Sequence, residues 1–295
     1  MAICQFCKGE ARVFIRARDY NRRISLRDFD YVRCPACKLI SISAVPDDLG
    51  HYYTQEYYRI PSLRDLKKVA DSERYKIAMV RDYCKSGRLL EIGPAFGVFA
   101  YQAKQAGFEV DAIEMNDKCC RYLKETVGIN VYKSDVPHRA VAAMRKHDVI
   151  ALWHVLEHLV NPWECLSAMV ENLNPHGILV IATPNPDAFQ FRLLGRLWPH
   201  VDAPRHVHLI PEKVLSAYLK RLGMEPVKVT ANDKGGRSWN RFGWQRYLMN
   251  RFSGKWMQAV CFIAGYLLSI PFSLWELQGL NGCAYTSVFK KKVPV

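Results

Sequence analysis

Three side chains that can move protons or bind a metal ion lie close together near the middle of the chain. His154, Glu157 and His158 directly follow the apolar segment 147–153, which we expect to form a β-strand. If a helical turn begins at His154, the residues three and four positions later lie on the same face of that turn. Because a histidine exchanges protons near neutral pH, this cluster predicts a general base or a metal site at the end of the strand.

A turn that contains two glycines follows another strand-like run, residues 88–92. Gly93 permits backbone angles that are closed to other residues, and Gly97 allows a helix and a strand to approach closely. A helix-like pattern begins directly after the turn. In α/β sheets such turns lie at the carboxyl ends of the strands, where ligands bind, so the sequence predicts a ligand site here.

The next predicted strand, residues 108–114, ends in an acidic residue. Glu114 lies 21 positions after Gly93, close to the ~20 residues that separate a glycine turn from a ribose-binding carboxylate. Ala95 replaces the glycine that would let the backbone approach a pyrophosphate in a dinucleotide site. A nucleoside without a pyrophosphate therefore fits this turn better than a dinucleotide.

The turn resembles the first motif of the class I S-adenosylmethionine (SAM) methyltransferases, which reads acid-x-Gly-x-Gly-x-Gly. Glu91, Gly93 and Gly97 match this motif, whereas Ala95 departs from it. The resemblance implies that SAM is the cofactor and that Asp135 contacts its adenine; the alternative is that Asp135 only caps a helix. The residues that we expect to hold SAM are Glu91, Gly93, Ala95, Gly97, Glu114, Asp135 and Trp153.

The residues His-Val-Leu-Glu-His at 154–158 resemble those of the ubiquinone O-methyltransferase type. In that type the matching glutamate and histidine positions are associated with a divalent metal, and a glutamate stands where this chain has His154. The resemblance therefore implies a second, divalent metal at His154, Glu157 and His158.

A long loop after the fifth predicted strand carries Pro204-Arg-His-Val-His208, and the same family has a similar Pro-Arg-His-Leu near its acceptor pocket. The resemblance makes His206 a candidate base and Arg205 a candidate contact for an anionic group. The alternative is that His208 packs internally while Arg205 and His206 cap the next helix. The catalytic candidates are therefore His154, His158 and His206, and the sequence does not choose among them.

Two pairs of cysteines near the start of the chain have the spacing of metal-binding turns: Cys4 with Cys7, and Cys34 with Cys37. Four thiolates fill a tetrahedral Zn²⁺ site, so we expect a structural zinc ion with no position open to a reacting water. Methyltransferases of bacterial sugar and glycan modification carry a similar amino-terminal zinc ribbon. The alternatives are two unrelated cysteine pairs and a basic ribbon that binds nucleic acid.

The alternation of strand-like and helix-like segments predicts an α/β fold: a Rossmann-like seven-stranded methyltransferase sheet with an antiparallel last strand and a small N-terminal zinc ribbon. We expect a zinc-ribbon-like domain at 1–45, a linker at 46–70, and a methyltransferase domain at 71–295 with an insertion at 235–281. The linker tyrosines are expected to pack the ribbon on the main domain rather than to line the acceptor site; they are Tyr52, Tyr53, Tyr57 and Tyr58.

The insertion begins with a basic and aromatic segment and continues with twenty uncharged residues, 256–275. A segment of that length can span a bilayer, but a pair of strands flanking the insertion places both its ends on the same side of any membrane. The pattern instead fits a segment that lies in the membrane interface and is drawn to anionic lipid. The alternatives are a helix packed on the sheet or in a dimer contact, and a surface that binds nucleic acid.

The net charge of +14 favours an acidic partner. Ten cysteines without a signal peptide predict a reducing cytoplasm, with the protein peripheral on the inner membrane face. We predict a SAM-dependent methyltransferase that acts on O or C of a small or lipid-linked acceptor, such as a sugar, glycan or quinone-like compound. The alternatives are an RNA methyltransferase and a SAM-binding or scaffold protein without turnover. A histidine base predicts that activity falls below about pH 6.

Overall fold

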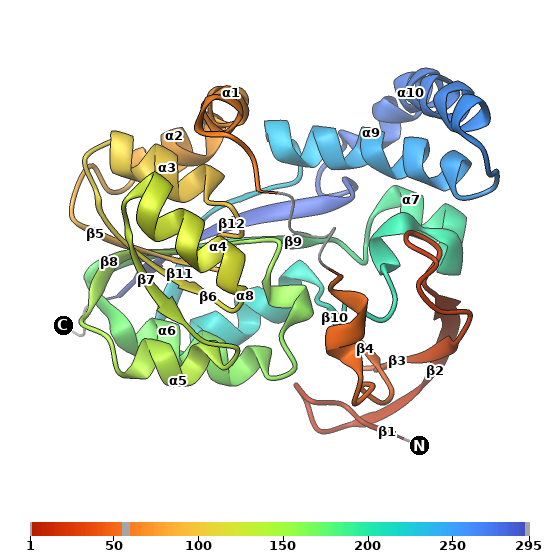
Figure 1. The fold of residues 1–295 in the computed structure, drawn as a ribbon. Coiled ribbons are helices and arrows are strands. Elements are labelled where there is room, and N and C mark those ends of the chain that lie inside the picture. Colours follow the sequence, from red (N-terminus) through yellow and green to blue (C-terminus); the bar gives the residue numbers. More distant parts are fainter. Residues whose placement is uncertain (1, 55–59, 293–295) are drawn as a thin grey trace.

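A computed structural model of the protein describes residues 2–54 and 60–292, and Figure 1 shows its fold. The main part is a seven-stranded sheet in the order β11-β12-β9-β8-β5-β6-β7. The strands β5 to β9 are parallel, and β12 lies antiparallel between β9 and β11. The predicted Rossmann-like methyltransferase sheet is thereby confirmed. Its strands are β5 Arg88–Ile92, β6 Glu109–Glu114, β7 Asn130–Lys133, β8 His147–Trp153, β9 Leu173–Pro184, β11 Met224–Thr230 and β12 Ala284–Lys291.

Both faces of this sheet are covered by helices, as parallel strands require. Leu89 and Leu90 of β5 are both fully buried, and they point to opposite faces because successive strand residues alternate. Leu89 packs in the core with α1 to α4, and Leu90 packs in the core with α5, α6 and α8. Figure 1 shows these two helix layers on either side of the sheet. The helices are α1 Leu63–Ser72, α2 Tyr75–Arg81, α3 Val98–Gln105, α4 Asp117–Tyr122, α5 Pro137–Ala142, α6 Pro162–Asn172 and α8 Glu212–Arg221.

Two helical segments of the main body are irregular. The chain turns at Glu73 and Arg74, which separates α1 from α2. The helix that begins at Asp117 is regular only to Tyr122 and continues as a π-helical turn. That turn widens the helix just before Gly128, whose left-handed backbone ends it.

A second, antiparallel sheet of the order β1-β2-β3-β4-β10 forms the amino-terminal lobe. Its strands β2 and β3 pair as an antiparallel hairpin. Ion pairs between Arg16 and Asp30 and between Arg18 and Asp28 join the two strands near the turn. The strands of the lobe are β1 Ala2–Ile3, β2 Glu10–Arg18, β3 Asp28–Arg33, β4 Ile40–Ile42 and β10 His208–Leu209.

The lobe and the main body are joined by buried contacts. The strand β10 comes from the main body and pairs with β4, and Tyr31 Oη donates a hydrogen bond to the backbone oxygen of His206 at 2.8 Å. Tyr52 is buried in the core that the two parts share. Tyr57 and Tyr58 lie outside the described residues. The lobe therefore positions the loop that carries His206.

Two helices, α9 Lys234–Met249 and α10 Lys255–Glu276, occupy the insertion between β11 and β12. Figure 1 shows them side by side, and Gly265 permits their close approach, because a Cβ there would lie 2.4 Å from the Cα of Gln245. The buried carboxylate of Glu276 accepts hydrogen bonds from Trp244 at 2.8 Å and from Gln190 of α7, Phe189–Leu194, at 2.7 Å. These bonds fix the insertion to the main body.

The helix α10 is long and apolar enough to cross a membrane by length and composition, and it is the one such helix among the described residues. Only 17% of its most apolar stretch is buried. Its outward side chains include Ile263, Leu267 and Leu274, which are 61%, 58% and 68% exposed. The insertion thus presents a continuous apolar surface to its surroundings.

Candidate active site

The glycine turn after β5 has the backbone that its sequence predicts. Gly93 and Gly97 have φ angles of +66° and +80°, a region that favours glycine. A Cβ at Gly93 would lie 2.7 Å from a methyl group of Val155, so there is also no space for a side chain at this position. Ala95 between them has a φ of +51°, and its N–H donates a hydrogen bond to Glu114 Oε2 at 3.0 Å.

Glu114 ends β6 and lies beside this turn. Its second oxygen, Oε1, accepts a hydrogen bond from the N–H of Asn116 at 2.8 Å. The carboxyl group is 4% exposed, and burial raises its pKa although the backbone donors of Asn116 and Ala95 act in the opposite direction. Two backbone donors therefore hold a buried carboxyl group in one orientation at the sheet edge.

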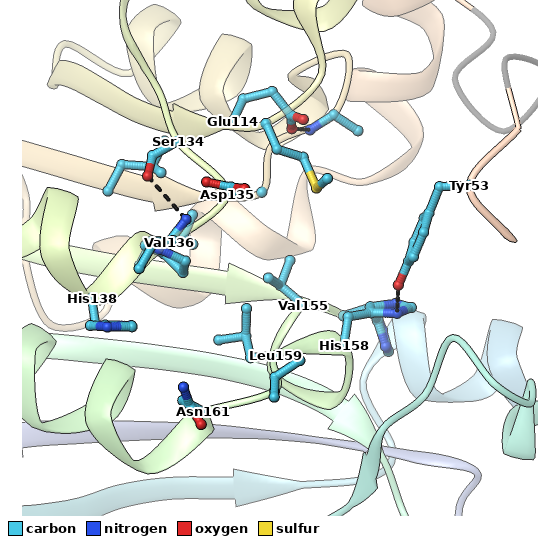
Figure 2. A pocket seen from close by; sticks show the side chains of 18 of the residues that line it. Tyr53, Glu114, Ser134, Asp135, Val136, His138, Val155, His158, Leu159 and Asn161 are labelled. Carbon is cyan, nitrogen blue, oxygen red and sulfur yellow. Dashed lines mark hydrogen bonds between the residues drawn. The ribbon is translucent and has the colours of Figure 1, made fainter. Parts of the chain in front are cut away.

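A cavity of about 540 Å³ opens at the carboxyl ends of β5, β6, β7 and β8. We call it the first cavity, and Figure 2 shows several of its side chains. Of the residues expected to hold SAM, it is lined by Gly93, Ala95, Glu114, Asp135 and Trp153. Further lining residues not expected from the sequence include Tyr53, Met115, Ser134, Val136, His138, Leu159 and Asn161.

Two of the expected SAM residues, Glu91 and Gly97, do not line the first cavity. Glu91 is 4% exposed, and burial raises its pKa to about 8 despite the nearby cation of Lys76. Its Oε2 atom has no hydrogen-bond partner among the described residues. Gly97 is buried against Leu123 at the start of α3. Both residues are therefore buried next to the turn and do not face the first cavity.

A second cavity, of about 600 Å³, adjoins the first. Its lining comes from six parts of the chain: the amino-terminal lobe, Thr54, the segment after β8, Pro184 at the end of β9, the loop 199–206, and α9. His154 and His158 line both cavities and form the wall between them. The lining residues that the following paragraphs use are Arg22, Glu157, His200, Asp202, His206, Trp239, Phe242 and Arg246.

His154 does not begin a helical turn, so that expectation is wrong. Its φ is +58°, its N–H donates a hydrogen bond to the oxygen of Ala182 at 2.8 Å, and the 3-10 turn covers Leu156–His158. The left-handed backbone nevertheless brings its Nδ1 to 3.5 Å from Glu157 Oε1. The ring of Trp239 lies on the imidazole, with 4.4 Å between the ring centres.

Glu157 is a buried anion. It is 1% exposed, and its Oε2 accepts a hydrogen bond from Thr183 Oγ1 at 2.9 Å. Burial raises the pKa of this carboxyl group, but the imidazoles of His154, His158 and His206 outweigh burial and lower it to about 2. The carboxylate therefore stays ionised throughout the physiological range.

His158 is held neutral. Burial and the neighbouring His206 lower its pKa to about 4. Its Nδ1 lies 2.9 Å from the backbone oxygen of Arg205 and 3.0 Å from Tyr53 Oη, the contact that Figure 2 marks with a dashed line. Because a backbone oxygen can only accept, a hydrogen bond to Arg205 requires the proton on Nδ1 and leaves Nε2 with a free lone pair.

His206 lines the second cavity but not the first. It is 8% exposed, and its Nδ1 lies 2.8 Å from the backbone oxygen of His200. Ligand atoms of Glu157, His158 and His206 all lie within 4.8 Å of one another, which is close enough to hold one metal ion. His154 is not part of this group, so the metal set that we expected has His206 in its place.

Arg205 is buried and paired within the protein, which corrects our expectation that it contacts an anionic group. Its guanidinium is fully buried and pairs with Asp19 at 2.8 Å and with Asp202 at 2.7 Å. It therefore ties the lobe to the loop. His208 packs internally, as the alternative interpretation holds, between Ser41 Oγ at 2.9 Å and the oxygen of Val160 at 3.3 Å.

The four amino-terminal cysteines converge in two turns of the same form. The sulfur atoms of Cys4 and Cys37 lie 3.6 Å apart, and those of Cys7 and Cys34 lie 3.4 Å apart. All four lie within 4.8 Å of one another. A tetrahedral zinc ion with bonds of about 2.3 Å places its sulfur ligands about 3.8 Å apart. The cluster has the ligand type and size of such a site.

Comparisons with known proteins agree with this geometry. The family model described as "Methyltransferase domain" matches residues 64–229, more than half of the chain. The chain is 28% identical over 174 residues to the ubiquinone biosynthesis O-methyltransferase of Cereibacter sphaeroides, with 56% of this chain and 68% of the relative covered. It is 30% identical over 178 residues to the enzyme of the same name from Dinoroseobacter shibae, with 57% and 69% covered.

A solved structure shows the same fold. The crystal structure of a SAM-dependent methyltransferase from Archaeoglobus fulgidus matches with a TM-score of 0.51 and 20% identity. The match covers 77% of this chain and 94% of that one. At this level of identity the likeness concerns the fold alone.

Proposed function

The chain belongs to the class I SAM-dependent methyltransferase family, and from this premise we propose that it transfers the methyl group of SAM to a hydroxyl oxygen of a small, lipid-like acceptor. Its similarity to ubiquinone biosynthesis O-methyltransferases supports oxygen as the methylated atom and a lipid-like acceptor. The amino-terminal cysteine lobe is the feature that favours a sugar or glycan acceptor instead. The experiment below includes both acceptor classes.

The first cavity fits SAM. Its volume of about 540 Å³ lies within the range of about 300–1,000 Å³ that is typical of small-molecule sites. Glu114 offers carboxylate lone pairs to ribose hydroxyl groups, and Asp135 offers the same to the adenine amino group. The apolar side chains of Val136 and Leu159 provide walls for an aromatic base.

The observation that carries the proposal is the wall shared by the two cavities. A methyltransferase must bring an acceptor oxygen to the methyl group and remove the proton of that oxygen. His154 and His158 line both the first cavity and the second, so a base on this wall reaches the point where the two ligands meet. His206 lines only the second cavity and is less suited to this role.

We assign the base to His154 and a positioning role to Glu157. SAM, when bound, supplies an electrophilic methyl group on a positively charged sulfur. His154 takes the hydroxyl proton while the acceptor oxygen gains the methyl group, and the carboxylate 3.5 Å away stabilises the resulting imidazolium. His158 is a weaker base, because the burial that lowers its pKa to about 4 also disfavours its protonated form.

Binding a divalent cation, together with His158 and His206, is an alternative role for the Glu157 carboxylate. Glu157 Oε1 has no hydrogen-bond partner among the described residues, and the three ligand atoms lie within 4.8 Å of one another. Carboxylate and imidazole groups are ordinary ligands of such ions. Activity that is lost on treatment with a chelator and restored by a divalent ion would support this role.

We further propose that the cysteine lobe holds a structural zinc ion. Cys4 and Cys34 begin two turns in which Lys8 and Lys38 have left-handed backbones and donate hydrogen bonds to the cysteine oxygens, at 3.0 Å and 2.9 Å. The repetition of one turn around four converging sulfur atoms supports a metal site rather than two unrelated cysteine pairs.

We propose a cytoplasmic enzyme that binds the inner membrane surface through α9 and α10. The exposed apolar side of α10 is flanked by exposed cations, among them Arg241, Arg251 and Lys255. The guanidinium of Arg241 lies over the ring of Tyr266 in α10. An apolar helix bordered by cations fits a membrane interface that contains anionic lipid, where a lipid-like acceptor is found.

Methyl transfer from isotope-labelled SAM tests the proposal. Purified, zinc-loaded protein would be given a membrane lipid extract, a polar glycan fraction and total RNA in parallel. Label in the lipid extract is the expected result, and label in the RNA would contradict the proposal. Calorimetry with SAM on the same protein separates a wrong acceptor from a failure to bind the cofactor.

A further inference from the structure

The second cavity has chemically different groups at its floor and at its mouth. Glu157 and His206 at the floor are 1% and 8% exposed. Arg22, from the loop between β2 and β3, is exposed, and Arg246 of α9 is half-buried. A buried carboxylate and a buried imidazole therefore lie deep in the cavity, and cations from two different parts of the chain lie near its opening.

The cation of Arg246 lacks a matching anion. Its guanidinium makes no hydrogen bond or ion pair with any residue among those the structure describes. The nearest carboxylate of the cavity, Asp202, is occupied by Arg205 at 2.7 Å and by Asn21 at 2.5 Å. A half-buried cation is costly to leave unpaired, so a ligand that brings an anion would remove this cost.

The charges around Arg246 favour an anion as well. Burial and the neighbouring cations of Arg22 and Arg23 all act to lower its pKa, whereas Asp202 and the more distant Asp19 act to raise it. Both of these carboxylates are paired with the buried Arg205. The two acidic groups that act on the pKa of Arg246 are therefore already used by Arg205.

Two aromatic rings line the cavity beside the cations. Trp239 and Phe242 of α9 pack with their ring centres 5.6 Å apart, and Trp239 also contacts His154. The rings extend from Arg246 on the same helix toward the base. The planes of the two rings meet at 83°, so they offer an edge-to-face aromatic wall that suits an apolar or ring-containing part of a ligand.

We propose that the second cavity binds the methyl acceptor through an anionic group, a phosphate or a carboxylate, which Arg246 and Arg22 hold at the mouth while the acceptor hydroxyl faces His154. This inference rests on the proposed function, because it assigns the second cavity to the acceptor. Bidentate hydrogen bonds from a guanidinium recognise both kinds of anion. The amino-terminal lobe and the insertion then both contribute to acceptor binding, since each supplies one of the two arginines.

Calorimetry with three small probes of similar shape tests the inference. Full-length, zinc-loaded protein saturated with S-adenosylhomocysteine would be titrated with phenyl phosphate, benzoate and benzyl alcohol. We expect the anions to bind and the alcohol to bind at least tenfold more weakly. The stronger of the two anions indicates whether the acceptor carries a phosphate or a carboxylate. Equal binding of the alcohol and both anions would overturn the inference.

Variants of the arginines complete the test. Arg246→Gln should weaken binding of the preferred anion at least tenfold, and the neighbouring exposed Arg241→Gln, outside the cavity, should not change it. Arg22→Gln alters an exposed side chain, so it provides the same test if Arg246→Gln does not fold. Unchanged anion affinity in both cavity variants would contradict the inference. If S-adenosylhomocysteine binds while the anions do not, this inference fails and the proposed function stands.

Discussion

His154 Nδ1 lies 3.5 Å from Glu157 Oε1, at the wall between the two cavities. The contact depends on a left-handed backbone at His154, which turns the imidazole back toward the carboxylate. A non-glycine residue in this conformation stores strain of about 1–3 kcal/mol, and such residues occur often at functional sites. The strain is offset here by the hydrogen bond from His154 N–H to Ala182 and by the buried partner Glu157.

Replacing Glu157 with glutamine should lower kcat strongly. The variant keeps the shape of the side chain but removes the charge that stabilises the imidazolium, and a placed general base contributes about 10²–10⁴-fold. We expect a loss of at least about tenfold in kcat, with the SAM dissociation constant unchanged by calorimetry. Glu164→Gln, on the exposed side of α6, is the matched control. A Glu157→Gln enzyme with full kcat would remove the positioning role.

The pH profile of kcat/KM distinguishes the candidate bases. Protonation removes the lone pair of the base, so activity falls as the pH decreases through its pKa. An unperturbed histidine titrates near about 6.5, whereas the pKa of His158 is lowered to about 4 by burial and by His206. We expect activity to fall below about pH 6, as a histidine base predicts. A fall near pH 4 would assign the base to His158.

This measurement needs a control for folding. The pKa values of His158, His200 and His208 are lowered mainly by burial, to about 4, 3 and 4. In the unfolded chain these groups bind protons from about pH 6.5 downward, so the folded state loses stability as the pH decreases from there. Tryptophan fluorescence at each pH shows whether the loss of activity reflects protonation of the base or unfolding of the protein.

Gly93→Ala should weaken SAM binding. The new Cβ would lie 2.7 Å from Val155 Cγ2, and the φ of +66° costs a non-glycine residue about 1–2 kcal/mol. We expect at least a tenfold loss of SAM affinity by calorimetry, of which Val155→Ala in the same chain restores a part. Gly107→Ala, with a φ of +90° and no atom near its Cβ, provides the control for strain alone. Unchanged SAM affinity in Gly93→Ala would exclude this turn from the cofactor site.

The parts of the site that the sequence predicts are those that depend on local structure. Gly93 follows one strand and Glu114 ends the next, so the strands and the spacing place both residues at one sheet edge before any tertiary contact is known. Tyr53, Arg22 and Trp239 reach the two cavities from segments far apart in the chain. No periodicity or spacing relates such segments, because only packing of the lobe and α9 on the main body brings them together.

The sheet and the loop that carries Arg205 show the same division between features that local sequence predicts and features that tertiary packing determines. The alternation of strands and helices predicts a mostly parallel sheet, and the resemblance to methyltransferases implies its antiparallel last strand. The role of Arg205 does not, because its two partners, Asp19 and Asp202, include one from the lobe. The resemblance of this loop to the family's Pro-Arg-His-Leu motif implies anion binding by Arg205, and only the burial of its guanidinium reverses that interpretation.

Removal of the metal from the cysteine lobe should destabilise the protein and open the second cavity. Zinc binding contributes about 10–16 kcal/mol to folding in small zinc peptides, and the lobe supplies Arg22 to the cavity. We expect one zinc per chain by atomic absorption, and a lower melting temperature in Cys34→Ser. Cys84→Ser, outside the cluster, is the control. Native protein without zinc but with the same melting temperature would contradict a structural zinc ion.

The exposed side of α10 should bind vesicles that contain anionic lipid. Its apolar residues lose contact with water when they enter the interface, at about 25 cal/mol per Å² of apolar surface, and the nearby cations add an attraction that salt weakens. Replacing Ile263, Leu267 and Leu274 by glutamine should abolish sedimentation with such vesicles and leave SAM affinity intact, because α10 does not line the first cavity. Val13→Gln with Leu26→Gln changes exposed residues of the lobe and is the control. Sedimentation that persists in the α10 variant, or that is equal on neutral vesicles, would assign this surface to a protein partner instead.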